Sequence, residues 1–454
     1  MTFTSINPAT GTLLKTVQVW SEPALEQCLR QVARVTPVWA AQPLAERAAL
    51  LRQLAELLRT RREVLARLIT LEMGKLLVEA QAEIEKCAWG CEYYAEHGAE
   101  FLARDRVVTD ATLSYVQYEP LGTVLAVMPW NFPFWQVFRC VAPALMAGNT
   151  VVLKHAANVP QCALAIEELF SAAGFPVDVF RTLLITSHQV GRVIADPRVQ
   201  AVSITGSVAA GRAVAAIAGG QLKKTVLELG GSDPFIVLED ADLDIAVAQA
   251  VTARFLNAGQ SCIAAKRMIV VQAVADDFVR NLQAVVESLR PGDPLAEATT
   301  LAPLARADLR DELHTQVSDS IAQGALPVTG CVPLPGPGSF YAPSLLDQVK
   351  PGMRAWHEEL FGPVACVLRA RDEREAVRIA NDTCFGLGGS VWTQDSERGE
   401  RIASVLQCGA VFVNGIVKSD PRLPFGGIKQ SGYGRELSRY GLLEFVNIKT
   451  VWIK

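Results

Sequence analysis

Cys262 ends a small polar turn, GQSC, and a cysteine in such a place could act as a nucleophile. The thiolate is the attacking form, so a reactive cysteine needs a polar or electropositive and partly accessible turn rather than apolar packing. Most free cysteines are instead buried and inert. The turn alone therefore leaves a structural thiol as an open alternative.

Two other side chains could take part in chemistry at a carbonyl group. Glu228 lies in the apolar string VLELGG, where a carboxylate is either a desolvated general base or a satisfied structural acid. Asn131 follows the end of an apolar run, and its amide could donate to a developing oxyanion or simply cap a turn.

Arg139 and a glycine turn suggest binding functions. Arg139 lies near the start of an apolar helix, where it could bind a substrate carboxylate or pair with an acid of the protein. The string ITGSVAAG places Gly206 and Gly211 between an apolar run and a helical stretch. Such a turn can approach a phosphate closely, although a plain tight turn explains it as well. The glycine-rich LPFGGIKQSGYGRE could be a loop folded against a site or a surface loop.

These residues stand among short apolar runs that alternate with helical stretches, which predicts buried parallel strands with helical crossovers. Two α/β units in series are the simplest arrangement. Ser21 is expected to cap a helix, and leucines at helical spacing predict another around residues 50–58. The predicted strands are 115–120, 123–130, 150–154, 201–207, 225–231, 233–238, 267–272 and 445–454.

Composition limits the classes of protein that the chain can belong to. Its 454 residues require two or three domains, and a net charge of −4 without a basic stripe argues against a nucleic-acid partner. The first residues resemble no secretion signal, and polar residues and prolines interrupt the most apolar region, 121–153, so we expect no membrane association. The ten cysteines form no CxxC pair and no metal-ligand spacing, which predicts free thiols, a cytoplasmic location and no metal.

Taken together, the motifs resemble those of the aldehyde dehydrogenase superfamily along almost the whole chain. They come in the family's order: LEMGK, PWNFP, TVVLK, TGS with a later glycine, LELGG, GQSC, EELFGPV and PFGG followed by K, SG and GRE. The strings KHAANVP and LELGGSDPF look closest to one bacterial branch, the succinate-semialdehyde dehydrogenases.

The resemblance implies a modified Rossmann domain for the cofactor, an α/β catalytic domain and a small β-arm that joins subunits. We expect the cofactor-binding domain at 1–105 and 122–230, the catalytic domain at 231–436, and the oligomerisation arm at 106–121 and 437–454. The arm implies a homo-oligomer, at least a dimer.

The resemblance also assigns catalytic roles. Cys262 would form a thiohemiacetal and then a thioester, Asn131 with the backbone N–H of Cys262 would hold the oxyanion, and Glu228 would activate the hydrolytic water. The residues that match the family's cofactor site are Trp130, Lys154, Gly206, Ser207, Glu359 and Phe361.

Ala157 departs from the pattern of NAD-preferring members, which usually carry a glutamate at this position. A carboxylate there would accept the ribose 2′-OH and repel a 2′-phosphate. Its absence beside Lys154 predicts that NADP⁺ is preferred and NAD⁺ is usable.

Four residues are expected to line the substrate tunnel: Trp135, Arg139, Ser261 and Ser419. A cation and hydroxyls suit an aldehyde with a distal carboxylate, so we predict succinate semialdehyde, with glutarate semialdehyde or an uncharged aldehyde as alternatives. A dehydrogenase that passes the acyl group to coenzyme A is disfavoured. That branch generally lacks the general base, whereas this chain has Glu228 at its position. A catalytically idle protein on this fold is disfavoured by the intact Cys262, Glu228 and Asn131.

Overall fold

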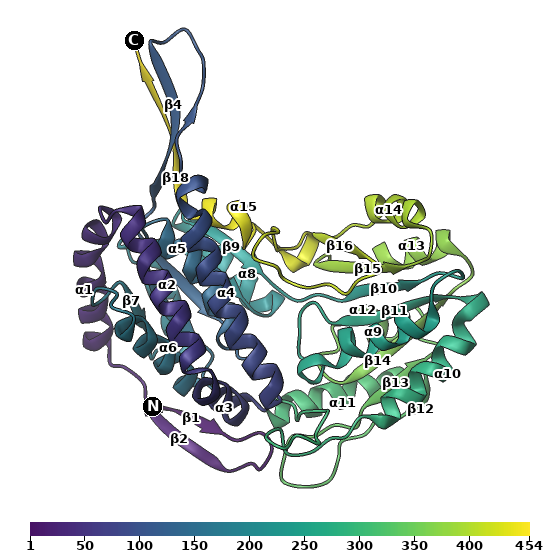
Figure 1. Ribbon diagram of the computed structural model, residues 1–454. Coiled ribbons are helices and arrows are strands. Elements are labelled where there is room, and N and C mark those ends of the chain that lie inside the picture. Colours follow the sequence, from purple (N-terminus) through teal and green to yellow (C-terminus); the bar gives the residue numbers. More distant parts are fainter.

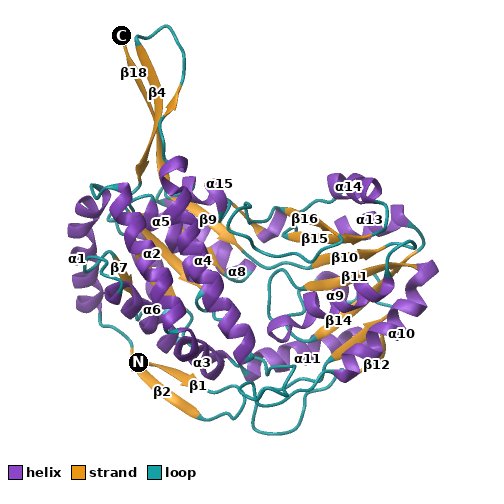
Figure 2. Cartoon of the chain, viewed as in Figure 1, coloured by secondary structure: helices purple, strands orange, loops and turns teal.

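The computed structural model describes residues 1–454 as two α/β halves from which a thin β-arm projects (Figure 1). Figure 2 shows that helices cover the sheet of each half. A two-stranded antiparallel hairpin, β1 (Thr2–Ile6) and β2 (Leu13–Gln18), runs along one edge of the molecule from the N-terminus. None of the helices is both long and apolar enough to cross a membrane.

The first half contains a six-stranded sheet that is parallel apart from one edge strand. Its strands, in spatial order, are β17 (Gly432–Tyr433), β9 (Lys224–Glu228), β8 (Val199–Thr205), β5 (Thr123–Met128), β6 (Thr150–His155) and β7 (Phe180–Thr182). The accompanying helices are α1 (Glu22–Ala40), α2 (Leu44–Thr60), α3 (Arg62–Met73), α4 (Leu77–Phe101), α5 (Trp135–Met146), α6 (Pro160–Ala172), α7 (Ser187–Ala195) and α8 (Val208–Gly220).

The second half contains a seven-stranded sheet, again parallel apart from one edge. Its strands, in spatial order, are β12 (Leu326–Thr329), β13 (Ser344–Asp347), β14 (Val364–Ala370), β11 (Ala265–Val271), β10 (Asp233–Val237), β15 (Gly388–Trp392) and β16 (Ala410–Val413). Its helices are α9 (Leu243–Phe255), the 3₁₀ turn η1 (Leu256–Gly259), α10 (Gln272–Ser288), α11 (Ala307–Ala322), α12 (Arg354–His357), α13 (Glu373–Asn381), α14 (Ser396–Val405) and the 3₁₀ turn η2 (Lys429–Ser431).

The arm is a three-stranded antiparallel sheet whose tip holds the C-terminus (Figure 1). It consists of β3 (Asp105–Arg106), β4 (Leu113–Pro120) and β18 (Val446–Ile453), and α15 (Ser438–Leu443) leads into it. Several apolar side chains of the arm are exposed, among them Val108, Ile448 and Trp452. An isolated chain therefore leaves apolar arm surface in water.

The runs that the sequence predicts as strands are all strands in the structure, and the crossovers between them are helical. Ser21 caps α1 by accepting a hydrogen bond from the backbone N–H of Ala24. One strand lies outside the range expected for its domain: β17, from the glycine-rich 423–436 string, pairs with β9 rather than with the second sheet. The string therefore crosses between the halves and closes against Glu228.

Stacked phenylalanines hold α5 in place after β5 of the six-stranded sheet. Phe134 and Phe138 of the α5 region stack with ring centroids 6.4 Å apart, and Phe138 stacks on Phe170 of α6 at 5.8 Å. All three are buried. This packing holds the segment 129–135 rigidly at the carboxyl end of β5, where open α/β sheets bind ligands.

Candidate active site

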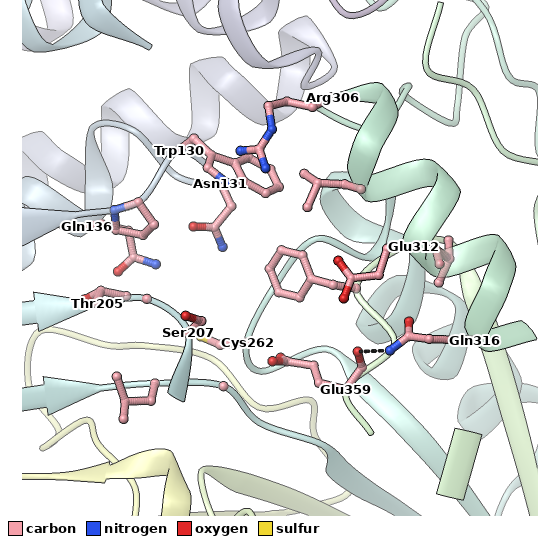
Figure 3. Close-up of a pocket in the computed structure, with 17 residues that line it drawn as sticks. Trp130, Asn131, Gln136, Thr205, Ser207, Cys262, Arg306, Glu312, Gln316 and Glu359 are labelled. Carbon is pink, nitrogen blue, oxygen red and sulfur yellow. Dashed lines mark hydrogen bonds between the residues drawn. The ribbon is translucent and has the colours of Figure 1, made fainter. Parts of the chain in front are cut away.

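Cys262 lies between two cavities. One, of about 450 Å³, is lined on both sides by residues of the two halves, including Trp130, Asn131, Gly206, Ser207, Glu359 and Phe361 (Figure 3). The other, of about 370 Å³, is lined by Trp135, Arg139, Ser261 and Ser419 among others. Because Cys262 lines both cavities, a group bound in either one can reach the thiol.

The turn before Cys262 has an unusual backbone. Asn257, Ala258 and Gly259 have φ values of 54°, 52° and 73°, so three successive residues adopt the left-handed conformation. A side chain at Gly259 would meet the carbonyl oxygen of Gly362 at 2.2 Å, which explains why only glycine fits. Strain of this kind persists only where surrounding contacts enforce it, and it is typical of functional sites.

Asn257 supplies one set of these contacts. Its Nδ2 donates to the carbonyl oxygens of Asn131, at 2.7 Å, and of Gln260, at 3.1 Å. Its backbone N–H donates to the carboxylate of Glu79 on α4. These contacts link the turn, which belongs to the second half, to residues of the first half.

Lys266 connects the nucleophile to a predicted cofactor residue. Its Nζ donates to the carbonyl oxygens of Ser261, at 2.7 Å, and Cys262, at 2.8 Å. The same Nζ lies 3.0 Å from Oε1 of Glu359. Glu359, which the resemblance places at the nicotinamide ribose, is therefore linked through one lysine to the backbone of the nucleophile turn.

Two hydrogen-bond donors beside the thiol are available for an oxyanion. Asn131 Nδ2 uses one of its hydrogens for the carbonyl oxygen of Gln260, at 3.1 Å, which leaves the second hydrogen. The backbone N–H of Cys262 makes no hydrogen bond in the structure. The pair therefore has the composition of an oxyanion hole.

The electrostatic state of Cys262 differs from the expectation of a stabilised thiolate. Burial raises the pKa of its thiol to about 12, and the nearby cations Arg139 and Lys266 offset only part of this effect. The free protein thus holds Cys262 as the neutral thiol at pH 7. The two cations still favour the thiolate once the proton has an acceptor.

Glu228 forms a buried cluster with Glu436 and Arg139. Burial, together with the charge of Glu436, raises the pKa of Glu228 well above the ordinary range, whereas Arg139 and Arg435 lower it. Neither carboxyl oxygen of Glu228 has a hydrogen-bond partner. A buried carboxyl group of this kind can exchange a proton with a water near neutral pH, as a general base must.

Arg139 pairs with an acid of the protein. The sequence had left open whether its partner is such an acid or a substrate carboxylate. Its guanidinium pairs with Glu436, donates from Nη2 to Thr205 Oγ1 at 3.3 Å and lies over the Phe425 ring. Arg139 lines the second cavity while paired with Glu436, so the cation there is not free of an internal partner. Its role in binding a substrate carboxylate stays a prediction.

The first cavity fits a dinucleotide cofactor. Ser207 caps α8 by accepting from the N–H of Ala210, so the helix N-terminus faces the cavity at Gly206 and Ser207. A Cβ at Gly206 would meet no atom nearer than 3.9 Å, which leaves open space for a phosphate beside the backbone. Trp130 and Phe361 form an edge-to-face pair with ring centroids 5.9 Å apart.

Lys154 and Ala157 stand apart from that cavity, at the end of β6. Lys154 is half-buried, makes no ion pair, and has a pKa lowered by burial. Ala157 is exposed, and the amide Nδ2 of the neighbouring Asn158 is buried without a partner. An unpaired cation and an unused amide donor suit an anionic group such as a phosphate.

Several residues of the site escaped the sequence analysis. Glu436 appears there only within the quoted GRE string, and Asn257 and Lys266, on either side of the GQSC turn, do not appear there at all. Lys86 and Glu79 lie on a long helix that reads as ordinary amphipathic sequence. Only proximity in the fold distinguishes these residues. Among His, Cys, Asp and Glu side chains, the structure contains no group of three or more placed to hold a metal ion.

Comparisons with known proteins agree with this geometry. The model of the aldehyde dehydrogenase family matches residues 1–451. A protein of Synechocystis sp. named "Probable succinate-semialdehyde dehydrogenase (NADP+)" is 51% identical over 453 residues, 100% of both chains. The Escherichia coli succinate semialdehyde dehydrogenase named for NAD(P)+ is 47% identical over 99% of this chain and 97% of its own. The crystal structure of succinic semialdehyde dehydrogenase from Streptococcus pyogenes in complex with NADP+ superposes with a TM-score of 0.98, at 39% identity and 99% coverage of each chain.

We predict that Arg139→Ala impairs oxidation of charged and uncharged aldehydes alike, because it leaves Glu436 buried without its cation beside Glu228. Removing one partner of a buried pair costs about 3–5 kcal/mol of folding free energy. The measurements are kcat/KM for a carboxylate-bearing aldehyde and for an uncharged one of equal length, with urea unfolding. Arg139→Lys, which keeps the charge, should retain part of the kcat/KM and part of the free energy of unfolding that Arg139→Ala loses. A loss confined to the charged aldehyde would show instead that Arg139 binds the substrate carboxylate.

We also predict that alkylation of Cys262 by iodoacetamide accelerates throughout the range from pH 7 to 10, by about tenfold per pH unit. The reason is the pKa of about 12, which keeps the thiolate a minor species. Mass spectrometry of the Cys262 peptide gives the rate, and the exposed Cys384 provides an accessible thiol in the same digest. A plateau below pH 9 would show that the free protein already stabilises the thiolate.

Proposed function

Because the chain belongs to the aldehyde dehydrogenase family, we propose that it oxidises succinate semialdehyde to succinate, with NADP⁺ preferred and NAD⁺ usable. The observation that carries the proposal is the position of Cys262, which lines both a cofactor-sized cavity and a second cavity with room for a small aldehyde. The names of full-length relatives support the choice of substrate and cofactor.

The first step is attack of the Cys262 sulfur on the aldehyde carbon, which forms a C–S bond and turns the carbonyl oxygen into an oxyanion. The free N–H of Cys262 and the remaining amide hydrogen of Asn131 stabilise this oxyanion. The thiol proton must leave before or during attack, because burial holds the pKa of Cys262 at about 12. Glu228, which is close enough to act on the pKa of Cys262, can take this proton, directly or through water, and must pass it to solvent before the thioester is hydrolysed.

Loss of a hydride from the thiohemiacetal carbon leaves the acyl group on Cys262 as a thioester, and a nicotinamide nucleotide held beside the thiol would supply the hydride acceptor. Trp130, Phe361 and Glu359 line the cavity beside the thiol and would hold the nicotinamide there. Gly206 and Ser207, at the start of α8, would hold the phosphates.

Glu228 completes the turnover. In its ionised form it takes a proton from water, whose oxygen attacks the thioester carbon. The C–S bond then breaks, the carboxylic acid leaves, and the proton held by Glu228 passes to the Cys262 sulfur and restores the thiol. Its pKa, raised by burial and by Glu436, makes it a stronger base than an exposed glutamate. Since both of its oxygens lack partners, either can accept the proton.

We further propose that the chain works as a homo-oligomer, at least a dimer, in the cytoplasm. The projecting arm, with Ile448 and Trp452 exposed, supports association through β4 and β18. The absence of any disulfide among ten cysteines supports a reducing compartment.

Initial rates of reduced-cofactor formation test the reaction. We expect succinate semialdehyde to exceed glutarate semialdehyde, butanal and an aromatic aldehyde in kcat/KM. Cys262→Ala should abolish turnover while NADPH still binds with unchanged affinity in a fluorescence titration, because the thiol only borders the cofactor cavity. Turnover that survives in Cys262→Ala would contradict the mechanism, and equal rates with all four aldehydes would contradict the substrate.

Exchange of one residue tests the cofactor preference. Ala157→Glu should lower kcat/KM with NADP⁺ by about 10–100-fold and raise it with NAD⁺, because a carboxylate repels the 2′-phosphate and accepts the 2′-OH. Ala157→Gln has nearly the same size without the charge and is the matched control. If Gln changes the ratio as much as Glu does, bulk rather than charge determines the preference.

A further inference from the structure

Asn257 is a fully buried asparagine whose side chain contacts two segments of the site at once. Its Nδ2 donates to the backbone carbonyl oxygen of Asn131, at 2.7 Å, and to that of Gln260, at 3.1 Å. Asn131 lies on the loop after β5 in the first half, whereas Gln260 lies in the nucleophile turn of the second half. Both hydrogens of the primary amide are therefore used, one for each half.

The two acceptors belong to the segments that carry the oxyanion donors. Asn131 supplies its side-chain amide, and this amide also donates to the Gln260 carbonyl oxygen, at 3.1 Å. The unused backbone N–H of Cys262 follows Gln260 in the same turn. One carbonyl oxygen thus accepts from both asparagines, so the relative position of the two oxyanion donors depends on Asn257.

The backbone of Asn257 is held as closely as its side chain. Its N–H donates to both carboxylate oxygens of Glu79, at 3.1 and 3.2 Å. Its carbonyl oxygen accepts from the backbone N–H and from Nε2 of Gln260, at 3.0 and 3.1 Å. Its φ of 54° lies in the left-handed region, which asparagine adopts more readily than most residues with a Cβ. Asparagine therefore combines a low conformational cost with two donors on a short side chain.

The neighbours of the Asn257 amide determine its orientation. The reverse orientation would place Oδ1 against two carbonyl oxygens, none of which can donate a hydrogen bond. The observed orientation leaves Oδ1 buried without a partner. A buried acceptor without a donor lowers stability. The protein thus accepts a local loss of stability at the position that places two donors.

We propose that Asn257 is a positioning residue for the oxyanion hole. The inference rests on the proposed function, since it names a residue that aligns the donors needed by the thiohemiacetal oxyanion and by the tetrahedral intermediate of thioester hydrolysis. Asn257 acts through Asn131 and through the turn that carries Cys262. Because the oxyanion is absent from the bound aldehyde, poor alignment should lower kcat more than it raises KM.

Asn257→Asp tests the inference with almost no change in size. A carboxylate keeps the preference for the left-handed backbone but cannot donate to either carbonyl oxygen. For the aldehyde that the wild type oxidises fastest, we expect kcat to fall by about 100-fold and KM to change by no more than about threefold. NADPH should bind as in the wild type in a fluorescence titration, because Asn257 does not line the cofactor cavity.

Asn149 provides a matched control at the opposite end of the sheet. It is buried just before β6, and its Nδ2 also donates to two carbonyl oxygens, those of Ala144, at 3.1 Å, and Phe445, at 3.0 Å. Asn149→Asp removes the same pair of donors away from Cys262. It should lower the midpoint of thermal unfolding but leave kcat within about twofold of the wild type.

Alkylation by iodoacetamide separates misalignment of the oxyanion hole from a general loosening of the turn. Displacement of iodide by the Cys262 sulfur forms no oxyanion, so it does not need the hole. Asn257→Gly is the variant for this comparison, because it adds no charge and glycine adopts the left-handed backbone freely. Its kcat should fall by at least about tenfold, while its alkylation rate stays within about threefold of the wild type. An alkylation rate that falls in proportion to kcat would overturn the inference, since Asn257 would then only hold the nucleophile in place.

A double-mutant cycle determines whether Asn257 acts through Asn131. Asn131→Ala removes the amide that Asn257 positions, so adding Asn257→Gly should lower kcat far less in that background than in the wild type. Equal fold-losses in both backgrounds would overturn the inference, and so would a kcat within about twofold of the wild type in Asn257→Gly. Turnover that survives in Cys262→Ala contradicts the proposed function itself, so the two failures are distinguishable.

Discussion

Asn257, Ala258 and Gly259 adopt left-handed backbone conformations in succession, just before Cys262. A free peptide would not keep this shape, because each non-glycine residue in it is strained. The contacts that enforce it come from both halves: Arg254 donates to the carbonyl oxygens of Gly259, Leu360 and Val364, while Asn257 donates to Asn131. The position of the nucleophile therefore depends on contacts from both halves.

The same constraint explains the charges at the centre of the site. The two halves bury Cys262 and Glu228 away from water, and this loss of solvation raises the pKa values of both groups. The pKa of about 12 keeps Cys262 a neutral thiol in the free protein at pH 7, and burial likewise shifts Glu228 toward its neutral form. The buried Arg139–Glu436 pair beside them supplies a positive end toward the thiol without leaving an unbalanced charge. Reactivity is thus limited until a proton is moved.

Much of the fold was predictable because it depends on local patterns. Apolar runs such as 150–154 and 201–207 are buried strands, and the capping serine at 21 begins its helix as its chemistry requires. Residues of several quoted motifs, among them PWNFP, TGS, GQSC and EELFGPV, line the cavity beside Cys262, whereas Lys154 of TVVLK lies apart from it. The partner of Arg139 could not be predicted: Glu436 lies almost 300 positions away, on the loop that crosses between the sheets. The raised pKa of Cys262 was missed for a related reason, because a polar turn in the sequence does not reveal how much surrounding chain buries it.

The pairing of the cations in and around the site connects these observations. Near the reacting groups, Arg139 and Lys266 are held by Glu436 and Glu359, so their positions are fixed and their charge is balanced. Farther out, Lys154 and Lys86 are half-buried and unpaired. A cation kept partly out of water without a counter-ion weakens the free protein and strengthens the complex with an anion. The unpaired lysines are therefore better suited to anionic ligands than to uncharged ones, whereas the paired cations hold the nucleophile turn and the buried acids in place.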